Sequence, residues 1–245
     1  MAVVEGRRIV VLGGAGAVGE GVCRVLLQQG ARLAVPARSE EQVAGLREAL
    51  GEPTGLLTMV GEAGDRELAA GVRDEIVSGL GGVDDVIVSF GGWTQGDNLV
   101  DADLSIWTDR VANNNVLAHM VATQTWLPLL LEQNAGSFLL MNGGAGLEPF
   151  PTAGFVSIAA AAQLMLKDVL VAEHPDTKVR INSLVLMTPI FTRKMTEGDP
   201  AWLSNDEVGT MCAHLLSDAG ASIHGQSIEY GSHDQTPTLQ SNPST

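Results

Sequence analysis

The chain has 245 residues, of which 29 are aspartate or glutamate and 14 are lysine or arginine, so its formal net charge at pH 7 is −15. A hydrophobic content of 45% and a charged content of 18% exclude a disordered chain and predict one globular domain with a sizeable core. So acidic a chain offers few cations for phosphates, which argues against nucleic-acid binding.

The first element predicted along the chain is a strand that runs into a glycine turn and a helix. Residues Arg8–Glu20 read RIVVLGGAGAVGE, in which Gly14, Gly16 and Gly19 form the pattern G-x-G-x-x-G. Glycines in such a turn permit the bend, the approach of a diphosphate and the close packing of helix on strand. A glycine turn without a ligand is the alternative, but the strand before it and the helix after it favour a dinucleotide site.

Strands and helices alternate along the rest of the chain. We predict strands at residues 7–12, 31–35, 55–60, 85–89, 137–141, 178–186 and 226–230. The first helix ends near residue 29, and further helices are predicted at 39–50, 65–78, 104–131, 153–173 and 205–217. This alternation predicts an α/β fold of the Rossmann type, a doubly wound, mostly parallel seven-stranded sheet with helices on both faces. In such sheets, ligands lie beyond the carboxyl ends of the strands.

The end of the second strand bears on cofactor choice. An acidic residue there suits the ribose hydroxyls of NAD(H), whereas an arginine accommodates the 2′-phosphate of NADP(H). Here Arg38 and Ser39 precede the first acid, Glu40. The sequence therefore favours NADP(H) over NAD(H). The alternative is that Arg38 is a solvated loop residue paired with Glu40 or Glu41.

Two more glycine turns follow predicted strands. Phe90-Gly91-Gly92 comes after the strand at 85–89, and Asn142-Gly143-Gly144 comes after the strand at 137–141. Because the carboxyl ends of parallel strands share one sheet edge, we expect Gly91 and Gly92 to flank the cofactor.

The end of the chain is less regular. Residues 188–203 show no clear periodicity and are predicted to form a mobile substrate lid of a domain that spans residues 1–233. Residues 234–245 are predicted to form a polar tail. Eight apolar residues on loops or helix starts predict a pocket for a small apolar molecule, although core and lid packing would explain them equally well: Trp93, Leu147, Phe150, Phe155, Val156, Met187, Phe191 and Trp202.

Cysteine content and hydropathy bear on the cellular setting. Cys23 and Cys212 fall within separate helical patterns, which predicts reduced thiols and no metal site. The N-terminus runs directly into the first strand, so we expect no signal peptide. No uninterrupted apolar run looks long enough to cross a membrane, and the prediction is a cytoplasmic protein without membrane contact.

Several motifs in order make the chain resemble the short-chain dehydrogenase/reductase family along nearly its whole length. Ser89-Phe-Gly-Gly92 stands where the family usually has Asn-Asn-Ala-Gly. The stretch Asn115–Met120, with Pro128 later in the same helix, is similar to another family pattern, and so are Val179–Asn182 and the run from Leu216 to Gln226. The resemblance implies a set of cofactor-binding residues: Gly13, Gly14, Gly16, Val18, Gly19, Arg38, Ser39, Glu62, Gly91, Gly92 and Thr192.

The resemblance fails at the family's catalytic set of Asn, Ser, Tyr and Lys. Asn115 retains the Asn, but the Ser, Tyr and Lys positions fall on Gly143, Val156 and Ala160. A register shifted by one residue would place the last two on Phe155 and Ala159. The chain has one tyrosine, Tyr230, and three lysines, Lys167, Lys178 and Lys194, so no Tyr-x-x-x-Lys can be drawn anywhere. Ordinary ketoreductase or alcohol dehydrogenase activity is predicted to be severely impaired.

Two residues are candidate substitutes for the lost groups. His119 lies one helical turn beyond Asn115 and is of the usual acid/base type, or else it is a core or interface histidine. Asn142 could bind a substrate oxygen, or else it satisfies its own backbone in a turn.

Three functions stay open at this point. The chain is an atypical NADP(H)-dependent oxidoreductase, a non-redox isomerase or cyclase that uses the same pocket, or an inactive homologue that binds the cofactor and acts as a partner protein. The family resemblance also implies a homodimer or homotetramer formed through the helices at 104–131 and 153–173, where Ala159–Ala162 would permit close packing. Association with an active homologue is the further partner hypothesis.

Overall fold

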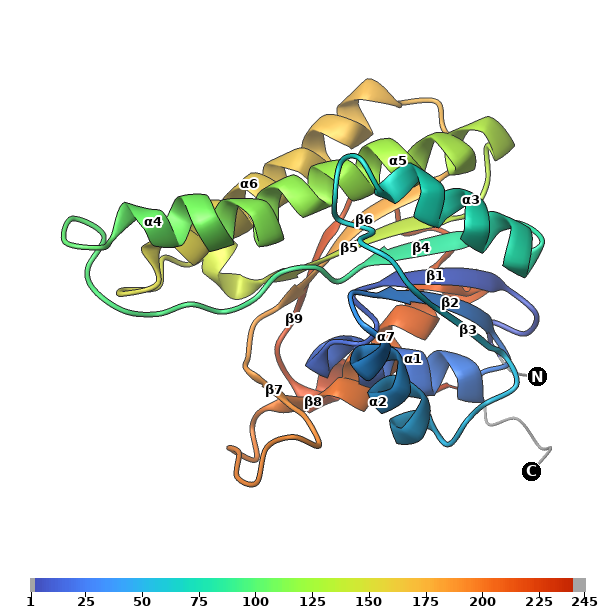
Figure 1. Ribbon diagram of the computed structural model, residues 1–245, viewed down its shortest axis with the longest axis horizontal. Coiled ribbons are helices and arrows are strands. Elements are labelled where there is room, and N and C mark those ends of the chain that lie inside the picture. The colour runs from blue at the N-terminus through green and yellow to red at the C-terminus, as the bar shows by residue number, and fades with distance from the viewer. Residues whose placement is uncertain (1–2, 240–245) are drawn as a thin grey trace.

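A seven-stranded sheet forms the centre of the computed structural model, which describes residues 3–239 (Figure 1). The strand order is β3-β2-β1-β4-β5-β6-β9, and every neighbouring pair is parallel. The strands are β1 (Arg8–Leu12), β2 (Arg32–Ala37), β3 (Leu56–Val60), β4 (Asp85–Val88), β5 (Ser137–Gly143), β6 (Arg180–Leu186) and β9 (Ser227–Tyr230). The predicted fold class is confirmed, and the sheet is wholly parallel.

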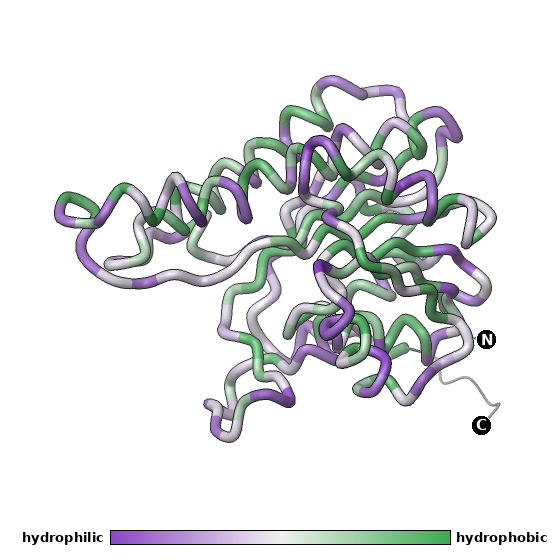
Figure 2. Tube along the Cα trace, in the orientation of Figure 1, coloured by the Kyte–Doolittle hydropathy of each residue, from purple (hydrophilic) through white to green (hydrophobic). Residues whose placement is uncertain are grey.

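Helices cover both faces of the sheet (Figure 1). On one face lie α1 (Ala17–Gln28), α2 (Glu40–Leu50) and α7 (Asn205–Leu216), and on the other lie α3 (Ala69–Leu80), α5 (Ala118–Gln133) and α6 (Gly154–Glu173). Successive side chains of a strand point to opposite faces, so Ile9 and Val11 of β1 join the core under α1 and α7, while Val10 joins the core under α5. Strands buried on both faces read as continuous apolar runs, which appear as green stretches in Figure 2.

The chain order places a switch point between β1 and β4. From β1 the sheet grows outward through β2 and β3 in one direction, and from β4 through β5, β6 and β9 in the other. Leu12 at the end of β1 is paired with Val88 at the end of β4, and the amide of Ser89 donates to the carbonyl oxygen of Leu12. The glycine turns that follow these two strands therefore lie beside each other at the carboxyl edge of the sheet.

One long helix runs from Leu104 to Gln133, as predicted, but its middle is not α-helical. The short helix α4 (Leu104–Ile106) leads into an 11-residue π-helical segment, η1 (Trp107–Leu117), which continues as α5. Figure 1 shows α4 and the first turns of α6 projecting beyond the end of the sheet. Asn115 belongs to the π-helical segment.

The segment predicted as a lid is tied together at its ends. Strands β7 (Ile190–Phe191) and β8 (Leu203–Ser204) pair in parallel and close the intervening residues into a loop. Beyond β9, the turn η4 (His233–Gln235) begins the predicted polar tail, whose residues 240–245 lie outside the described part of the chain. Two further short 3-10 turns are η2 (Gly144–Gly146), which follows β5, and η3 (Asp218–Gly220), which follows α7.

Helix α6 corrects the expectation about apolar runs. By length and composition alone, this 20-residue helix could cross a membrane, and it is the one such helix within residues 3–239. Its inner face packs on the sheet and on neighbouring helices through Val156, Ala159, Ala160 and Leu164, and core helices of this kind pass the same test. The cytoplasmic location stays a prediction.

Candidate nucleotide-binding and active site

The first glycine turn is built without room for side chains. Gly13 has φ +81°, and a Cβ on it would lie 2.3 Å from the carbonyl oxygen of Ser89. A Cβ on Gly14 would lie 2.8 Å from a Val35 methyl carbon, and one on Gly19 would lie 2.3 Å from the Gly13 carbonyl oxygen. The turn therefore brings β1, β4 and α1 into backbone contact, which a side chain at Gly13, Gly14 or Gly19 would separate.

Helix α1 presents its N-terminus at the carboxyl edge of the sheet. Gly16 is the N-cap residue, so no side chain of its own caps the first amides, and the first backbone bond joins the amide of Glu20 to the carbonyl of Gly16. Amides of Ala17, Val18 and Gly19 precede that bond and have no helical acceptor. Free amides and the helix dipole together form the kind of site that holds a diphosphate.

The residues predicted to contact the adenosine half of the NADP(H) cofactor lie at the ends of β2 and β3. Arg38 directly follows β2, is exposed, and forms no ion pair with any residue between 3 and 239, Glu40 and Glu41 included. The Ser39 hydroxyl caps α2 by accepting from the amide of Gln42 at 3.3 Å. Glu62 is exposed just beyond β3.

The second glycine turn, Phe90–Gly92, is hydrogen-bonded to the side chain of Asn115. The Nδ2 group of Asn115 donates to the carbonyl oxygen of Gly92 at 3.2 Å, and Gly91 has φ +128°. A Cβ on Gly91 would lie 3.5 Å from the Asn115 side chain, whereas one on Gly92 would meet no heavy atom of the described residues within 4 Å. Asn115 thus fixes a turn whose outer side is open.

The three positions predicted for the other catalytic residues, Gly143, Val156 and Ala160, carry no side-chain proton donor. Val156 and Ala160 lie one turn apart on the buried face of α6, and a Cβ on Gly143 would point into space free of described atoms within 4 Å. Each polar atom of the Asn142 side chain has a backbone partner, because its Oδ1 accepts from the amide of Gly143 at 2.7 Å and its Nδ2 donates to the carbonyl of Ala160 at 2.9 Å. Its side chain anchors β5 to α6.

His119 lies in the interior, with its ring edge-on to Phe90 at a centroid distance of 6.3 Å. Burial lowers the pKa of His119 to about 4, so the ring is neutral at physiological pH. Its Nδ1 lies 3.2 Å from Nε2 of Gln163, whose amide also donates to the main-chain oxygen of Asn115.

Sequence reasoning missed Gln163. The available signal was a single amide in the apolar stretch of α6 between Ile158 and Leu166, on the buried face of the helix.

The lid segment is tethered to α1 by ion pairs. Nε of Arg193 lies 2.6 Å from Oε1 of Glu20, a buried carboxylate in the first turn of α1 that also pairs with Arg24 at 2.8 Å. Arg24 in turn pairs with Asp206 of α7. Thr192, next to Arg193, is buried. The ion pair between Arg193 and Glu20 therefore places the lid segment beside the start of α1, next to the first glycine turn.

The predicted apolar pocket residues form separate pairs. The rings of Trp93 and Phe150 meet edge to face at 4.9 Å, and those of Phe155 and Trp107 lie 6.0 Å apart. Phe191 and Trp202 pack around Gly198 within the lid segment. Met187 lies against Gly144 and Gly231. Trp93, Leu147, Phe150 and Phe191 are exposed, so apolar surface is available on the loops that follow β4 and β5 and on the lid segment.

A hollow of about 330 Å³ lies at the opposite edge of the sheet, where the strands begin. It is lined in part by Arg7 and Asp84, which are engaged in ion pairs with Asp85 and Arg8. These charges stabilise the edge of the sheet, far from the glycine turns.

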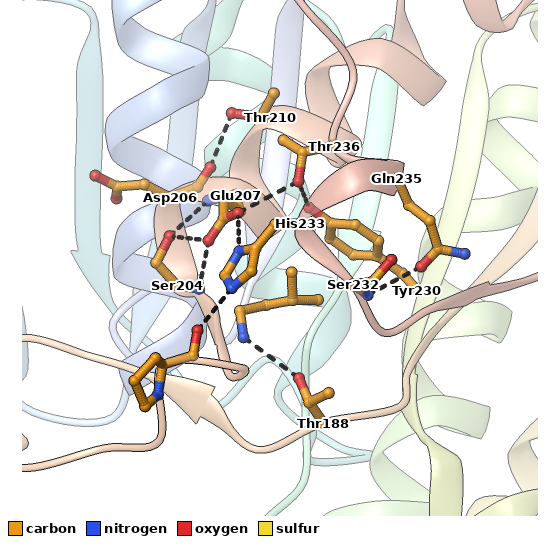
Figure 3. Close-up of polar contacts among 12 residues, drawn as sticks. Thr188, Ser204, Asp206, Glu207, Thr210, Tyr230, Ser232, His233, Gln235 and Thr236 are labelled. Atoms are coloured by element: carbon orange, nitrogen blue, oxygen red, sulfur yellow. Dashed lines mark hydrogen bonds and ion pairs between the residues drawn. The ribbon is translucent and has the colours of Figure 1, made fainter.

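The C-terminal turn is clasped to the end of the lid segment (Figure 3). Nδ1 of His233 lies 2.6 Å from Oε1 of Glu207, and Nε2 lies 2.9 Å from the carbonyl oxygen of Pro200. The other oxygen of Glu207 accepts from Ser204 in a capping box. Both imidazole partners are acceptors, so the doubly protonated ring satisfies both bonds.

The clasp is expected to weaken as the pH rises. Hydrogen bonds to Glu207 and Pro200 raise the pKa of His233, with Asp234 adding to the shift. A group whose pKa is higher in the folded chain stabilises that state below its unfolded pKa, about 6.5, and loses this effect as the pH passes the folded pKa. The His233→Ala substitution should therefore lower the melting temperature at pH 6 and have little effect at pH 9.

Glu207 sets the lower limit of this window. Partial burial acts to raise its pKa, but hydrogen bonds from His233 and Ser204 outweigh burial and lower it. Its contribution is present above its unfolded pKa and is lost as the pH falls through the folded value. Melting curves of the natural chain and of His233→Ala at pH 6 and pH 9 provide the test. An equal difference in melting temperature between the two proteins at both pH values would contradict a stabilising contact between His233 and Glu207.

The wholly parallel sheet, wound in two directions from a switch point with glycine turns at its carboxyl edge, defines a Rossmann-type α/β protein. Residues 7–200 match the family described as short chain dehydrogenase. The chain therefore belongs to the short-chain dehydrogenase/reductase family.

Curated relatives agree with this assignment. Bovine dehydrogenase/reductase SDR family member 4 is 30% identical over 190 residues, which cover 75% of this chain and 66% of the relative. The porcine protein of the same name is 28% identical, and the match covers 65% of its length. The chain thus spans just under two thirds of these two relatives. An uncharacterized oxidoreductase of Staphylococcus epidermidis is 25% identical, with 81% of this chain and 84% of the relative covered.

Solved structures share the fold. A short-chain type dehydrogenase/reductase from Mycobacterium ulcerans has a TM-score of 0.84 at 20% identity, covering 96% of this chain and 92% of that one. ElxO with NADP bound has a TM-score of 0.83 at 16% identity, covering 91% and 96%. A tyrosine-to-phenylalanine variant of ElxO has NADPH bound.

Proposed function

We propose that this chain binds NADP(H) at the carboxyl edge of the sheet and reduces a small apolar substrate without a Tyr/Lys proton relay. One contrast carries the proposal. The glycine turn that accommodates a dinucleotide is intact at backbone level, whereas Gly143, Val156 and Ala160 occupy the relay positions. The fold supports the binding half, because ElxO, which shares it, has NADP bound.

The residues present fit the cofactor. The free amides of Ala17, Val18 and Gly19 would hold the diphosphate, and the exposed Arg38 guanidinium, which forms no ion pair among residues 3–239, would hold the 2′-phosphate. Gly91 and Gly92 leave open space beside the second turn, and Thr192 would approach from the lid segment. When bound, NADPH supplies a hydride to an acceptor at this edge.

The chemistry of the acceptor follows from the missing donors. A ketone that gains a hydride becomes an alkoxide, which needs a positioned acid, and such an acid contributes about 10²–10⁴ in rate. Hydride addition to the β-carbon of an activated double bond instead moves an electron pair onto the conjugated oxygen as an enolate. Water can then deliver the proton to the α-carbon. Exposed Trp93, Phe150 and Phe191 offer an apolar surface to such a substrate.

Calorimetric titration with NADPH and NADH tests the cofactor half. The Arg38→Ala variant is expected to lose about 10–100-fold in NADPH affinity while NADH affinity stays unchanged, since a charge-assisted hydrogen bond contributes about 1.5–3 kcal/mol. Arg32→Ala, which removes an exposed arginine from the opposite end of β2, is the matched control and should bind both nucleotides like the natural chain. Equal affinity of the natural chain for both nucleotides would contradict the role of Arg38.

The redox half is tested by NADPH oxidation in the presence of an enone and of the matching saturated ketone. We expect turnover of the enone only. Conversion of a substrate without NADPH consumption would instead indicate a cofactor-independent isomerase or cyclase. A chain that binds NADPH but reduces neither compound, and that co-purifies with an active homologue, would indicate a partner protein.

We also propose a homo-oligomer formed through α5 and α6. Most exposed residues on the outer face of α6 are apolar, among them Ile158, Met165 and Val169, with Asp168 the exposed charge between them, and Met120 of α5 is exposed as well. Contiguous apolar surface on a folded protein is typical of an interface. Of the predicted small residues, Ala161 and Ala162 face outward, whereas Ala159 and Ala160 pack inward. Light scattering of the natural chain and of Met165→Asp tests this proposal, with a monomer expected only for the variant.

A further inference from the structure

A buried amide links α6 to the π-helical segment. Gln163 is 4% exposed, and its Nε2 group donates to the main-chain oxygen of Asn115, which is 48 residues away in sequence. The same group lies 3.2 Å from Nδ1 of His119. Since an amide NH₂ carries two protons, one can serve Asn115 and the other the neutral His119 ring. Both protons of the Gln163 amide nitrogen therefore have a buried acceptor within reach.

The backbone of the π-helical segment explains why an external donor is needed here. In η1 each amide donates to the carbonyl five residues back, as in the bond from Ala118 to Asn113, whereas in α5 the spacing is four. A change from five to four leaves one carbonyl at the junction without a backbone donor. Buried carbonyls need a partner, and Gln163 provides one to Asn115 at this junction.

The side chain of Asn115 extends the link to the site. Its Nδ2 donates to the carbonyl oxygen of Gly92 in the turn beyond β4. Gln163, Asn115 and Gly92 therefore form two consecutive hydrogen bonds from the interior of α6 to the edge of the candidate site.

We propose that Gln163 is a positioning residue, which fixes Asn115 at the π-to-α junction and thereby the Phe90–Gly92 turn against which the cofactor lies. The expected effect of Gln163 on NADPH affinity rests on the proposed function. The expected effect of Gln163 on the Phe90–Gly92 turn does not depend on that function.

The test uses Gln163→Met, which keeps the length of the side chain and removes the donor. We expect the dissociation constant for NADPH to rise about tenfold, as for the loss of one buried hydrogen bond. Gln124→Met, which replaces an exposed glutamine of α5, is the matched control and should bind like the natural chain. If Gln163→Met does not fold, Gln163→Asn, whose donor is one methylene too short, is expected to give the same effect.

A double-mutant cycle separates positioning from general stabilisation. If Gln163 acts through Asn115, then Gln163→Met combined with Asn115→Ala should bind NADPH no more weakly than Asn115→Ala alone. Multiplicative losses would overturn the proposal. So would a Gln163→Met variant with a lowered melting temperature but unchanged NADPH affinity.

Amide hydrogen exchange tests the role of Gln163 without relying on NADPH binding, and so separates this test from that of the proposed function. Amides of Phe90–Gly92 should exchange faster in Gln163→Met than in Gln124→Met, whether or not a nucleotide is present. If the natural chain binds no NADP(H), the proposed function fails, and the exchange result still decides the inference. Unchanged exchange at these amides would overturn it.

Discussion

The combined substitution Gly143→Ser, Val156→Tyr and Ala160→Lys is expected to accelerate NADPH-dependent reduction of a simple ketone at least about 100-fold, the lower value for a positioned proton donor. Val156 and Ala160 lie one turn apart on one face of α6, the spacing that lets a lysine act on a tyrosine. The Cβ direction at Gly143 opens onto free space among the described residues, so a hydroxyl can be added there. Asn115 is already in place.

The matched control carries Phe in place of the introduced tyrosine and keeps the other two changes. It adds the same bulk to α6 but no proton donor, so ketone reduction should stay at the level of the natural chain. The rates are compared at saturating NADPH, after circular dichroism and calorimetry show that both variants fold and bind the nucleotide. Equal rates for the two folded variants would mean that the missing donors do not limit the reaction.

Replacement of Gly19 by alanine is expected to weaken NADPH binding by about 100-fold or more, since each hydrogen bond from a helix amide to the charged diphosphate contributes about 1.5–3 kcal/mol. The added methyl group would lie 2.3 Å from the Gly13 carbonyl oxygen and 2.7 Å from the Gly14 Cα, both of them backbone atoms. Backbone cannot rotate away as a side chain can, so α1 must move out from β1. The amides at its N-terminus then leave the position where a diphosphate would bind.

Gly45→Ala provides the matched control for this prediction. Gly45 lies within α2, and a Cβ there meets no described heavy atom within 4 Å. Alanine in a helix interior is favoured over glycine by about 0.5–1 kcal/mol, so this variant should melt at a higher temperature and bind NADPH normally. Normal NADPH binding by a folded Gly19→Ala chain would remove the glycine turn from the proposed site.

The fold could be predicted because its signals are local. Each central strand is a short apolar run followed by glycine or a polar turn, as in Arg8–Leu12 and Ser137–Gly143, and helices such as α2 and α7 carry their own caps at Ser39 and Ser204. The β/α alternation then permits few topologies. The short ladder between β7 and β8 escaped prediction because two-residue strands leave no period to detect.

The π-helical segment could not be read from the sequence for a different reason. Weak helix formers such as Asn113–Asn115 lower its helical propensity but do not specify a π-helix, and what the structure adds is a carbonyl that accepts from Gln163 of another helix. Pairings of this kind depend on how α5 and α6 rotate against each other. The glycine turn, by contrast, was visible because the spacing of Gly14, Gly16 and Gly19 is itself a sequence pattern, although the atoms that exclude a side chain at Gly13 and Gly14 include Ser89 and Val35 from other parts of the sheet.

The ion pair between Arg193 and Glu20 has a thermodynamic consequence for the lid segment. Glu20 lies in the first turn of α1, close to the proposed diphosphate position, and Arg193 is one of its two cationic partners. Displacement of the segment would remove a positive charge and leave Glu20 less neutralised beside an anionic ligand. Ligand release and segment displacement would then favour each other reciprocally, by the same factor in both directions. Salt would weaken this coupling, because it screens the exposed Arg193.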